Sequence, residues 1–111
     1  MLEELEINAR ERKIPIMLHD GMEYLCEYIK NNNITRILEI GSAIGYSSIN
    51  MALVNDKIYI TTIEKDIDRY NEAVSNIHKF GLDKRINIIC DDALDTEISG
   101  IYDMIFIDAS K

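Results

Sequence analysis

The fold of this 111-residue chain is decided by residues 36–48, which read RILEIGSAIGYSS. The first five residues form an apolar run that is typical of a buried strand, and this run contains one acid, Glu39. Two glycines four positions apart follow, Gly41 and Gly45, and then a polar segment that can begin a helix. Because glycine lacks a Cβ, it suits a sharp strand-to-helix turn and lets a ligand lie against bare backbone. The segment therefore predicts a strand, a ligand-binding glycine loop and a helix.

The chemistry of this loop favours one ligand, S-adenosylmethionine (SAM). A ligand there meets the exposed N–H groups at the start of the helix, and Glu39 can receive a cationic or hydroxyl-bearing group. SAM carries an ammonium and a positive sulfonium. The dinucleotide fingerprint is G-x-G-x-x-G, and Ala43 replaces its second glycine, which disfavours an NAD-type site. On this motif alone, a SAM site and an ordinary α/β turn stay equally open.

Composition sets limits on the partners. The chain has 20 acidic and 12 basic residues and a formal net charge of −8, which gives no broad attraction to nucleic acid or anionic membranes. An RNA substrate would need a local basic patch. No apolar run approaches membrane-spanning length, and the acidic start lacks the features of a signal peptide. Cys26 and Cys90 are far apart in sequence, which predicts reduced core thiols in a cytoplasmic protein and no metal clip.

Helical and strand-like segments alternate along the chain. The predicted helices are 2–12, 20–32, 46–54 and 67–80, and the predicted strands are 36–40, 57–63, 86–90 and 102–107. This order predicts an α/β fold with a Rossmann-like, mostly parallel sheet in the strand order 3-2-1-4. We expect one domain, with N-terminal helices over 1–33 and a βαβ cofactor-binding half over 34–111.

Two of the helices carry clear side-chain patterns. In helix 20–32, Met22, Leu25 and Ile29 recur at helical spacing. Helix 67–80 is expected to begin at a cap on Asp66 and to end at Gly81. Its buried face is predicted to comprise Ile67, Tyr70, Val74 and Ile77.

Acidic residues follow the second and third strands. Glu64 lies 23 residues after Gly41, close to the offset of about 20 at which an acid binds ribose hydroxyls in mononucleotide-binding halves. The alternative is a solvated acid in a loop. After the third strand, Asp92 suits an adenine amino group, and the small Ala93 leaves room for the ring. Asp92 could equally cap a short helix that follows, which is the role that this residue alone favours.

The fourth strand ends at Asp108, and Lys111 follows three residues later. A carboxylate at that position can hold Mg²⁺, which prefers oxygen ligands and keeps positions open for a substrate. A lysine with a lowered pKa can act as a general base beside it. The alternative is that Asp108 only ends the strand and that Lys111 is a solvated end.

Four ordered motifs together resemble the cation-dependent class I SAM O-methyltransferases of the catechol and caffeoyl-CoA type. The motifs are residues 38–47, 63–64, 92–93 and 106–111. Residues 14–17, which read IPIM, are also similar to the bacterial branch that methylates 5-hydroxyuridine in tRNA. The resemblance implies methyl transfer from SAM to a hydroxyl oxygen. A small phenolic or catechol acceptor is the alternative substrate, and a non-catalytic SAM- or nucleotide-binding fragment is the alternative function.

The resemblance also implies a role for each site residue. SAM would contact Met17, Ser47, Glu64, Asp92 and Ala93, and Glu39 and Gly41 would shape its pocket. Asp108 would border SAM and act as the first Mg²⁺ ligand, and Lys111 would be the catalytic lysine. The family continues through an Asp-Asn pair that completes the metal site and through further strands, so the chain resembles an N-terminal half. We expect the 111-residue species to be inactive and to self-associate through the edge of the fourth strand or a bare sheet face.

Overall fold

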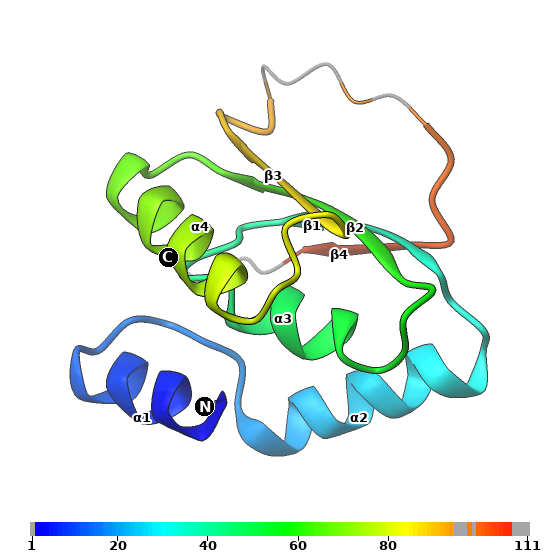
Figure 1. The fold of residues 1–111 in the computed structure, drawn as a ribbon, viewed down its shortest axis with the longest axis horizontal. Coiled ribbons are helices and arrows are strands. Elements are labelled where there is room, and N and C mark those ends of the chain that lie inside the picture. The colour runs from blue at the N-terminus through cyan, green and yellow to red at the C-terminus, as the bar shows by residue number, and fades with distance from the viewer. Residues whose placement is uncertain (1, 95–97, 99, 108–111) are drawn as a thin grey trace.

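The computed structural model describes residues 2–94, 98 and 100–107. Four parallel strands form one sheet in the order β3-β2-β1-β4, which confirms the predicted fold class and strand order (Figure 1). The elements in chain order are α1 (Leu2–Glu11), α2 (His19–Asn31), β1 (Arg36–Ile40), α3 (Tyr46–Ala52), β2 (Tyr59–Glu64), α4 (Ile67–Lys79), β3 (Ile86–Cys90) and β4 (Met104–Ile107). β1 and β3 have the predicted bounds, whereas β2 and β4 each begin two residues later than expected.

One face of the sheet carries the core. Alternate residues of each strand, including Ile37, Ile60 and Ile86, point to this face and pack with Ile49 and Ile77 from the helices. The helices lie on this same side of the sheet (Figure 1). Ile37 and Ile49 are fully buried. Burial of apolar area of this kind is the main favourable term in folding, so the helical side of the sheet supplies most of the stability.

The ends of α4 follow the sequence prediction. The Asp66 carboxylate accepts hydrogen bonds from the backbone N–H groups of Asp68 at 2.9 Å and Arg69 at 3.1 Å. These bonds satisfy donors that have no partner within the helix. At the other end, Gly81 adopts φ 68°, and the next residue, Leu82, donates back to the carbonyl of Ile77 at 3.1 Å. A positive φ favours glycine, so both predicted helix signals are confirmed.

The predicted buried face of α4 is wrong for two of its four residues, since Ile77 is buried and Tyr70 is partly buried as expected. Ile67 is 55% exposed and Val74 is 38% exposed. The buried residues are Ala73, Asn76 and Ile77. The helix is rotated from the expected orientation because a small residue and an amide, not large aliphatic side chains, meet the glycine loop.

The opposite face of the sheet is buried at Leu38 and Ile63 of the two central strands but exposed at the β4 edge. Among the residues that the structure describes, no helix covers it, and Ile105 and Ile107 of β4 are 60% and 61% exposed there. In the part of the chain described, no helix has the length and apolar character needed to cross a bilayer.

Both cysteines are free thiols. Cys26 is half-buried but Cys90 is exposed, so the prediction of a core thiol is wrong for Cys90, which lies at the end of edge strand β3.

Candidate cofactor-binding site

The glycine loop joins β1 to α3 at the carboxyl end of the sheet. Gly41, Ala43 and Gly45 have φ values of 97°, 48° and 90°. The backbone N–H of Gly41 donates to the carbonyl of Ile63 at 2.8 Å, which holds the start of the loop beside β2. Positive φ values are costly for residues with a Cβ, so the two glycines allow the tight path that the motif predicted.

Glu39 lies beneath this loop, fully buried. Its Oε1 atom accepts hydrogen bonds from the Ser48 hydroxyl of α3 and, at 2.7 Å, from the Thr62 hydroxyl of β2. The Thr62 hydroxyl is also 2.5 Å from that of Ser42 in the loop. A buried carboxylate is stable only when such partners compensate its lost hydration. Glu39 therefore ties β1, β2 and α3 together under the loop.

Glu64 stands at the carboxyl end of β2, next to the loop. Its Oε1 accepts a hydrogen bond from the backbone N–H of Ala43 at 2.7 Å, and its Oε2 accepts one from the N–H of Asp66 at 3.0 Å. The side chain is partly exposed. The structure thus brings together two sequence-predicted features, the glycine loop and the acid that follows β2.

The segment after β3 runs beside Glu64. The backbone N–H of Asp91 donates to the Glu64 carbonyl at 3.1 Å, so parallel pairing continues past the strand end. The Asp92 carboxylate accepts a hydrogen bond from the N–H of Leu94 at 2.9 Å, and the predicted cap of a following helix stays a prediction because residues 95–97 lie outside the described residues. Asp92 is exposed and Ala93 is partly buried. Both residues lie at the edge of the sheet where the glycine loop lies, because parallel strands end together.

Met17 lies in the connection between α1 and α2. It lines a cavity of about 630 Å³ formed by Glu6, Arg10, Met17, Leu18, His19, Asp20 and Gly21. The Arg10 guanidinium donates to the Met17 carbonyl at 3.3 Å.

Ser47, another predicted site residue, is buried, with 3% exposure, in the first turn of α3.

Two contacts between the N-terminal segment and the region of the glycine loop were not predicted from the sequence. Tyr46 directly follows the glycine motif, and its hydroxyl donates to the Glu6 carboxylate at 3.1 Å. Burial, together with this bond, raises the pKa of Tyr46 to about 12. Ile14 packs against Ile44 of the loop. The sequence signal for these contacts is weak, because Glu6 and Tyr46 are 40 residues apart and share no pattern.

Asn76 was also missed. This residue of α4 is 8% exposed, and its amide donates to the carbonyl of Ile44 at 2.8 Å. It therefore fixes the middle of the glycine loop from outside the loop. The sequence signal for Asn76 would have been a polar residue on the buried side of the helix. The spacing of the large aliphatic residues predicted a different buried side, so Asn76 was not recognised.

Asp108 and Lys111 lie outside the described residues. Within residues 2–94, 98 and 100–107, no group of three or more His, Cys, Asp or Glu side chains is arranged to hold a metal ion. The predicted Mg²⁺ ligand and catalytic lysine therefore stay predictions.

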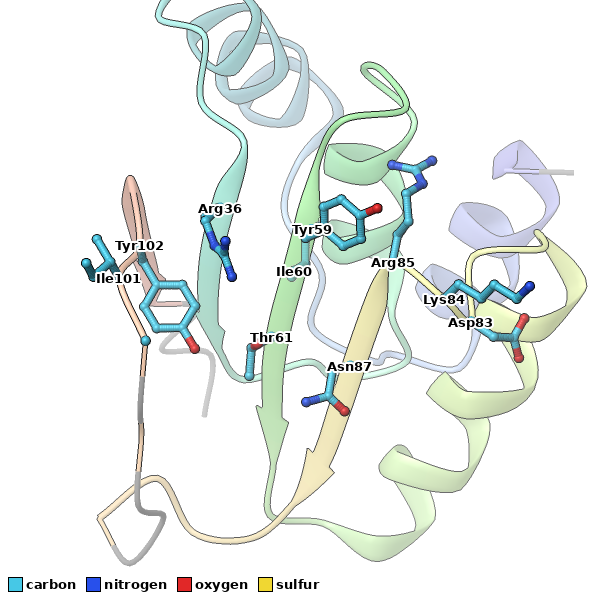
Figure 2. A pocket seen from close by; sticks show the side chains of 11 residues that line it. Arg36, Tyr59, Ile60, Thr61, Asp83, Lys84, Arg85, Asn87, Ile101 and Tyr102 are labelled. Atoms are coloured by element: carbon cyan, nitrogen blue, oxygen red, sulfur yellow. The ribbon is translucent and has the colours of Figure 1, made fainter.

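A second cavity, of about 330 Å³, lies at the other end of the sheet (Figure 2). Its lining includes Arg36, Tyr59 and Asn87 from the amino-terminal parts of three strands. Arg85 also borders it, and its guanidinium donates to three backbone carbonyls, those of Ala52, Asn55 and Ile58, each at 3.0 Å. Ligands of open α/β sheets bind at the carboxyl ends of the strands, so this cavity is separate from the candidate site.

Comparison with known proteins agrees with the geometry. A family model described as O-methyltransferase matches residues 1–111. The catechol O-methyltransferase of Niastella koreensis is 39% identical over 82 residues, which is 68% of this chain and 37% of that protein. The chain spans less than half the length of the curated relatives it matches.

Solved structures give the same result. A Staphylococcus aureus protein assigned to the caffeoyl-CoA O-methyltransferases has a TM-score of 0.94 at 36% identity, covering 99% of this chain and 54% of that chain. An O-methyltransferase from Bacillus cereus, solved in complex with S-adenosylhomocysteine (SAH), has a TM-score of 0.85 at 28% identity, covering 97% of this chain and 53% of that chain. The parallel sheet, the glycine loop and these matches together show that the chain belongs to the O-methyltransferase family.

Proposed function

We propose that the protein containing this chain transfers a methyl group from SAM to a hydroxyl oxygen. One observation carries the proposal: the Glu64 carboxylate lies against the glycine loop, bonded to the N–H of Ala43 at 2.7 Å. A carboxylate in this position can accept the two hydroxyls of a ribose. The SAH complex of the Bacillus cereus relative supports the same cofactor.

The cofactor fits the donors present at this edge of the sheet. Glu64 would accept the ribose hydroxyls, while Asp92 would accept from the adenine amino group and Ala93 would leave space for the ring. Gly41 and Ser47 would border the methionyl part, with Glu39 shaping the pocket from below. Met17 would close the pocket from the side of the N-terminal helices. SAM, when bound, supplies an electrophilic methyl group.

The reacting side is proposed from the family resemblance. Asp108 would border SAM and be the first ligand of a Mg²⁺ ion, and Lys111 would accept the proton of the acceptor hydroxyl. Such an ion lowers the pKa of a hydroxyl that it contacts. The residues of the site would hold the hydroxyl in line with the methyl group, and orientation of this kind supplies much of the rate acceleration. The test is methyl transfer by the protein at its natural length, which should cease with excess EDTA and in Asp108→Ala. Undiminished turnover in EDTA would exclude the metal-dependent mechanism.

For the acceptor we propose 5-hydroxyuridine in tRNA, on the similarity of residues 14–17 to the bacterial tRNA-modifying branch. The net charge of −8 weighs against a nucleic-acid substrate. A catechol or another small phenol is the second candidate, because a named relative is a catechol O-methyltransferase. Deletion of the gene should remove 5-methoxyuridine-type nucleosides from digested tRNA. Unchanged nucleosides would favour the phenolic acceptor.

We propose further that the 111-residue species alone is inactive as a methyltransferase, which leaves SAM or SAH binding as its remaining function. Exposed Ile105 and Ile107 on edge strand β4 support self-association of this species, since an open edge and an apolar face can pair with a second copy. Two free cysteines support a cytoplasmic location.

A further inference from the structure

A chain of hydrogen bonds joins the glycine loop to the N-terminal connection. The Tyr46 hydroxyl donates to Oε1 of Glu6 at 3.1 Å. Oε2 of Glu6 accepts from Nε and Nη2 of Arg10 at 3.2 and 3.0 Å. Nη2 of Arg10 also donates to the backbone carbonyl of Met17 at 3.3 Å. Three side chains thus connect the first residue of α3 to Met17.

Burial along this hydrogen-bond relay falls from Tyr46 through Glu6 to Arg10. Tyr46 is 3% exposed, and the side chain of Glu6 is 20% exposed, against 39% for Arg10. The hydrogen bond from Arg10 holds the pKa of Glu6 below its usual range, so Glu6 is ionised at neutral pH. Hydrogen bonds to an ionised carboxylate are about twice as strong as neutral ones. Glu6 can therefore hold both partners at once, one on each oxygen.

The hydrogen bonds link two parts of the chain that the proposed function places beside SAM, namely the start of α3 and Met17. Tyr46 directly follows Gly45 and precedes Ser47. Glu6, Arg10 and Met17 line a cavity formed by α1, the connection after it and the start of α2. Apolar packing of Ile14 on Ile44 runs beside the relay, but such packing has no fixed direction. The hydrogen bond from Arg10 to the Met17 carbonyl, in contrast, constrains the backbone at a defined atom.

We propose that Glu6 is a positioning residue of the cofactor site. Through Tyr46 it holds α1 against the glycine loop, and through Arg10 it sets the backbone that carries Met17. Glu6 does not touch the cofactor; it acts by placing Met17 beside it. This inference rests on the proposed SAM site, and it adds α1 to the parts of the chain on which cofactor affinity depends.

A double-mutant cycle on SAH affinity tests the relay, using the protein at its natural length and titration calorimetry. Tyr46→Phe and Arg10→Gln each remove one partner of Glu6. Each should weaken SAH binding about tenfold, the size expected when one bond to an ionised group is lost. Because both act through one carboxylate, the double variant should bind little worse than either single variant. Independent, multiplying effects would overturn the relay.

A spectroscopic readout separates positioning from general loss of structure. With methionine methyl groups labelled, the Met17 signal should shift when SAH saturates the wild type and should keep its free position in saturated Tyr46→Phe. Glu11→Gln is the matched control, because Glu11 is an exposed acid on the same helix; its affinity and its Met17 signal should equal those of the wild type. A Met17 shift in Tyr46→Phe equal to that of the wild type would overturn the role of Glu6.

The outcomes distinguish this inference from the function on which it rests. No SAH binding by the wild type would overturn the proposed function, and the role of Glu6 with it. Wild-type SAH binding that Tyr46→Phe and Arg10→Gln retain in full would overturn the role of Glu6 alone.

Discussion

Glu64 and Ala43 are hydrogen-bonded, carboxylate Oε1 to backbone N–H, at 2.7 Å, although 21 residues separate them in sequence. The bond joins the end of β2 to the loop after β1. The other oxygen of Glu64 caps the start of the next turn at Asp66. A charged group fixed by two backbone donors is held in place before any ligand arrives, and preorganisation of this kind lowers the cost of binding.

Removal of the Asn76 side chain should loosen the glycine loop from outside the pocket. In Asn76→Ala, the buried Ile44 carbonyl loses the amide that donates to it at 2.8 Å. An unsatisfied buried acceptor costs about 1–3 kcal/mol, so the free energy of unfolding in urea should fall by about that amount. Ser75→Ala, an exposed change on the same helix, should be nearly neutral. Equal stability of the two variants would contradict the assigned role of Asn76.

Two glycine substitutions should separate backbone strain from cofactor binding. Gly45 has φ 90°, and a Cβ there would lie 3.5 Å from the Cβ of Ala73; Gly81 has φ 68° with open space around it. A positive φ costs about 1–2 kcal/mol for a residue with a Cβ, so Gly45→Ala and Gly81→Ala should both lose about that much stability in urea. Only Gly45→Ala should also weaken SAH binding in calorimetry. Equal SAH affinity of the two variants would mean that the loop does not bind the cofactor.

The pH dependence of stability should include a contribution from Asp103. Hydrogen bonds from the backbone N–H groups of Thr35 and Arg36 hold the pKa of Asp103 below its usual range. The folded state therefore binds this proton less readily than the unfolded chain. The stabilisation is complete above the ordinary aspartate pKa of about 4 and is lost as pH falls through the lower folded-state value.

The contribution of the Asp103 carboxylate is measured as the free energy of unfolding in urea at several pH values between about pH 5 and pH 3. Asp103→Asn should be less stable than the wild type at the upper pH and should lose less stability on acidification. Asp56→Asn, in the exposed loop before β2, should keep the wild-type slope. Parallel slopes for wild type and Asp103→Asn would refute the assignment.

The open side of the sheet should make the 111-residue species self-associate. In sedimentation at micromolar concentration we expect dimers or larger species, and Ile105→Lys with Ile107→Lys should shift the distribution toward monomer because charges on an edge strand oppose pairing. Ile67→Lys is the control, since Ile67 is a similarly exposed isoleucine of α4. A monomer with a cooperative melt and no binding of hydrophobic dyes would contradict this expectation.

Local chemistry made much of the fold predictable. Asp66 and Gly81 mark the ends of α4 because capping depends on residues within one turn of the helix end. The strand order follows from the repeated βαβ pattern. Which side of α4 is buried could not be predicted in the same way, because Ala73 and Asn76 are buried by contacts with a loop about 30 residues earlier in the chain.

The sequence predicted those candidate site residues that lie at the carboxyl ends of the strands. Glu64 could be found from its spacing to Gly41, since parallel strands end at one edge of the sheet. The hydroxyls of Ser48 and Thr62, which bond to Glu39, and the bond between Tyr46 and Glu6 could not be found. They depend on how separate elements dock, and single-sequence periodicity carries no information on that.

Calorimetric titration with SAH, for wild type and Glu64→Ala, tests the central claim most directly. The wild type should bind SAH and not NAD, and Glu64→Ala should lose about 1.5–3 kcal/mol of SAH binding free energy, the range for bonds to a charged group. Asp56→Ala, which removes an exposed acid just before the amino-terminal end of β2, opposite to the end that carries Glu64, should bind as the wild type does. Equal SAH affinity of wild type and Glu64→Ala, or a preference for NAD, would contradict the account.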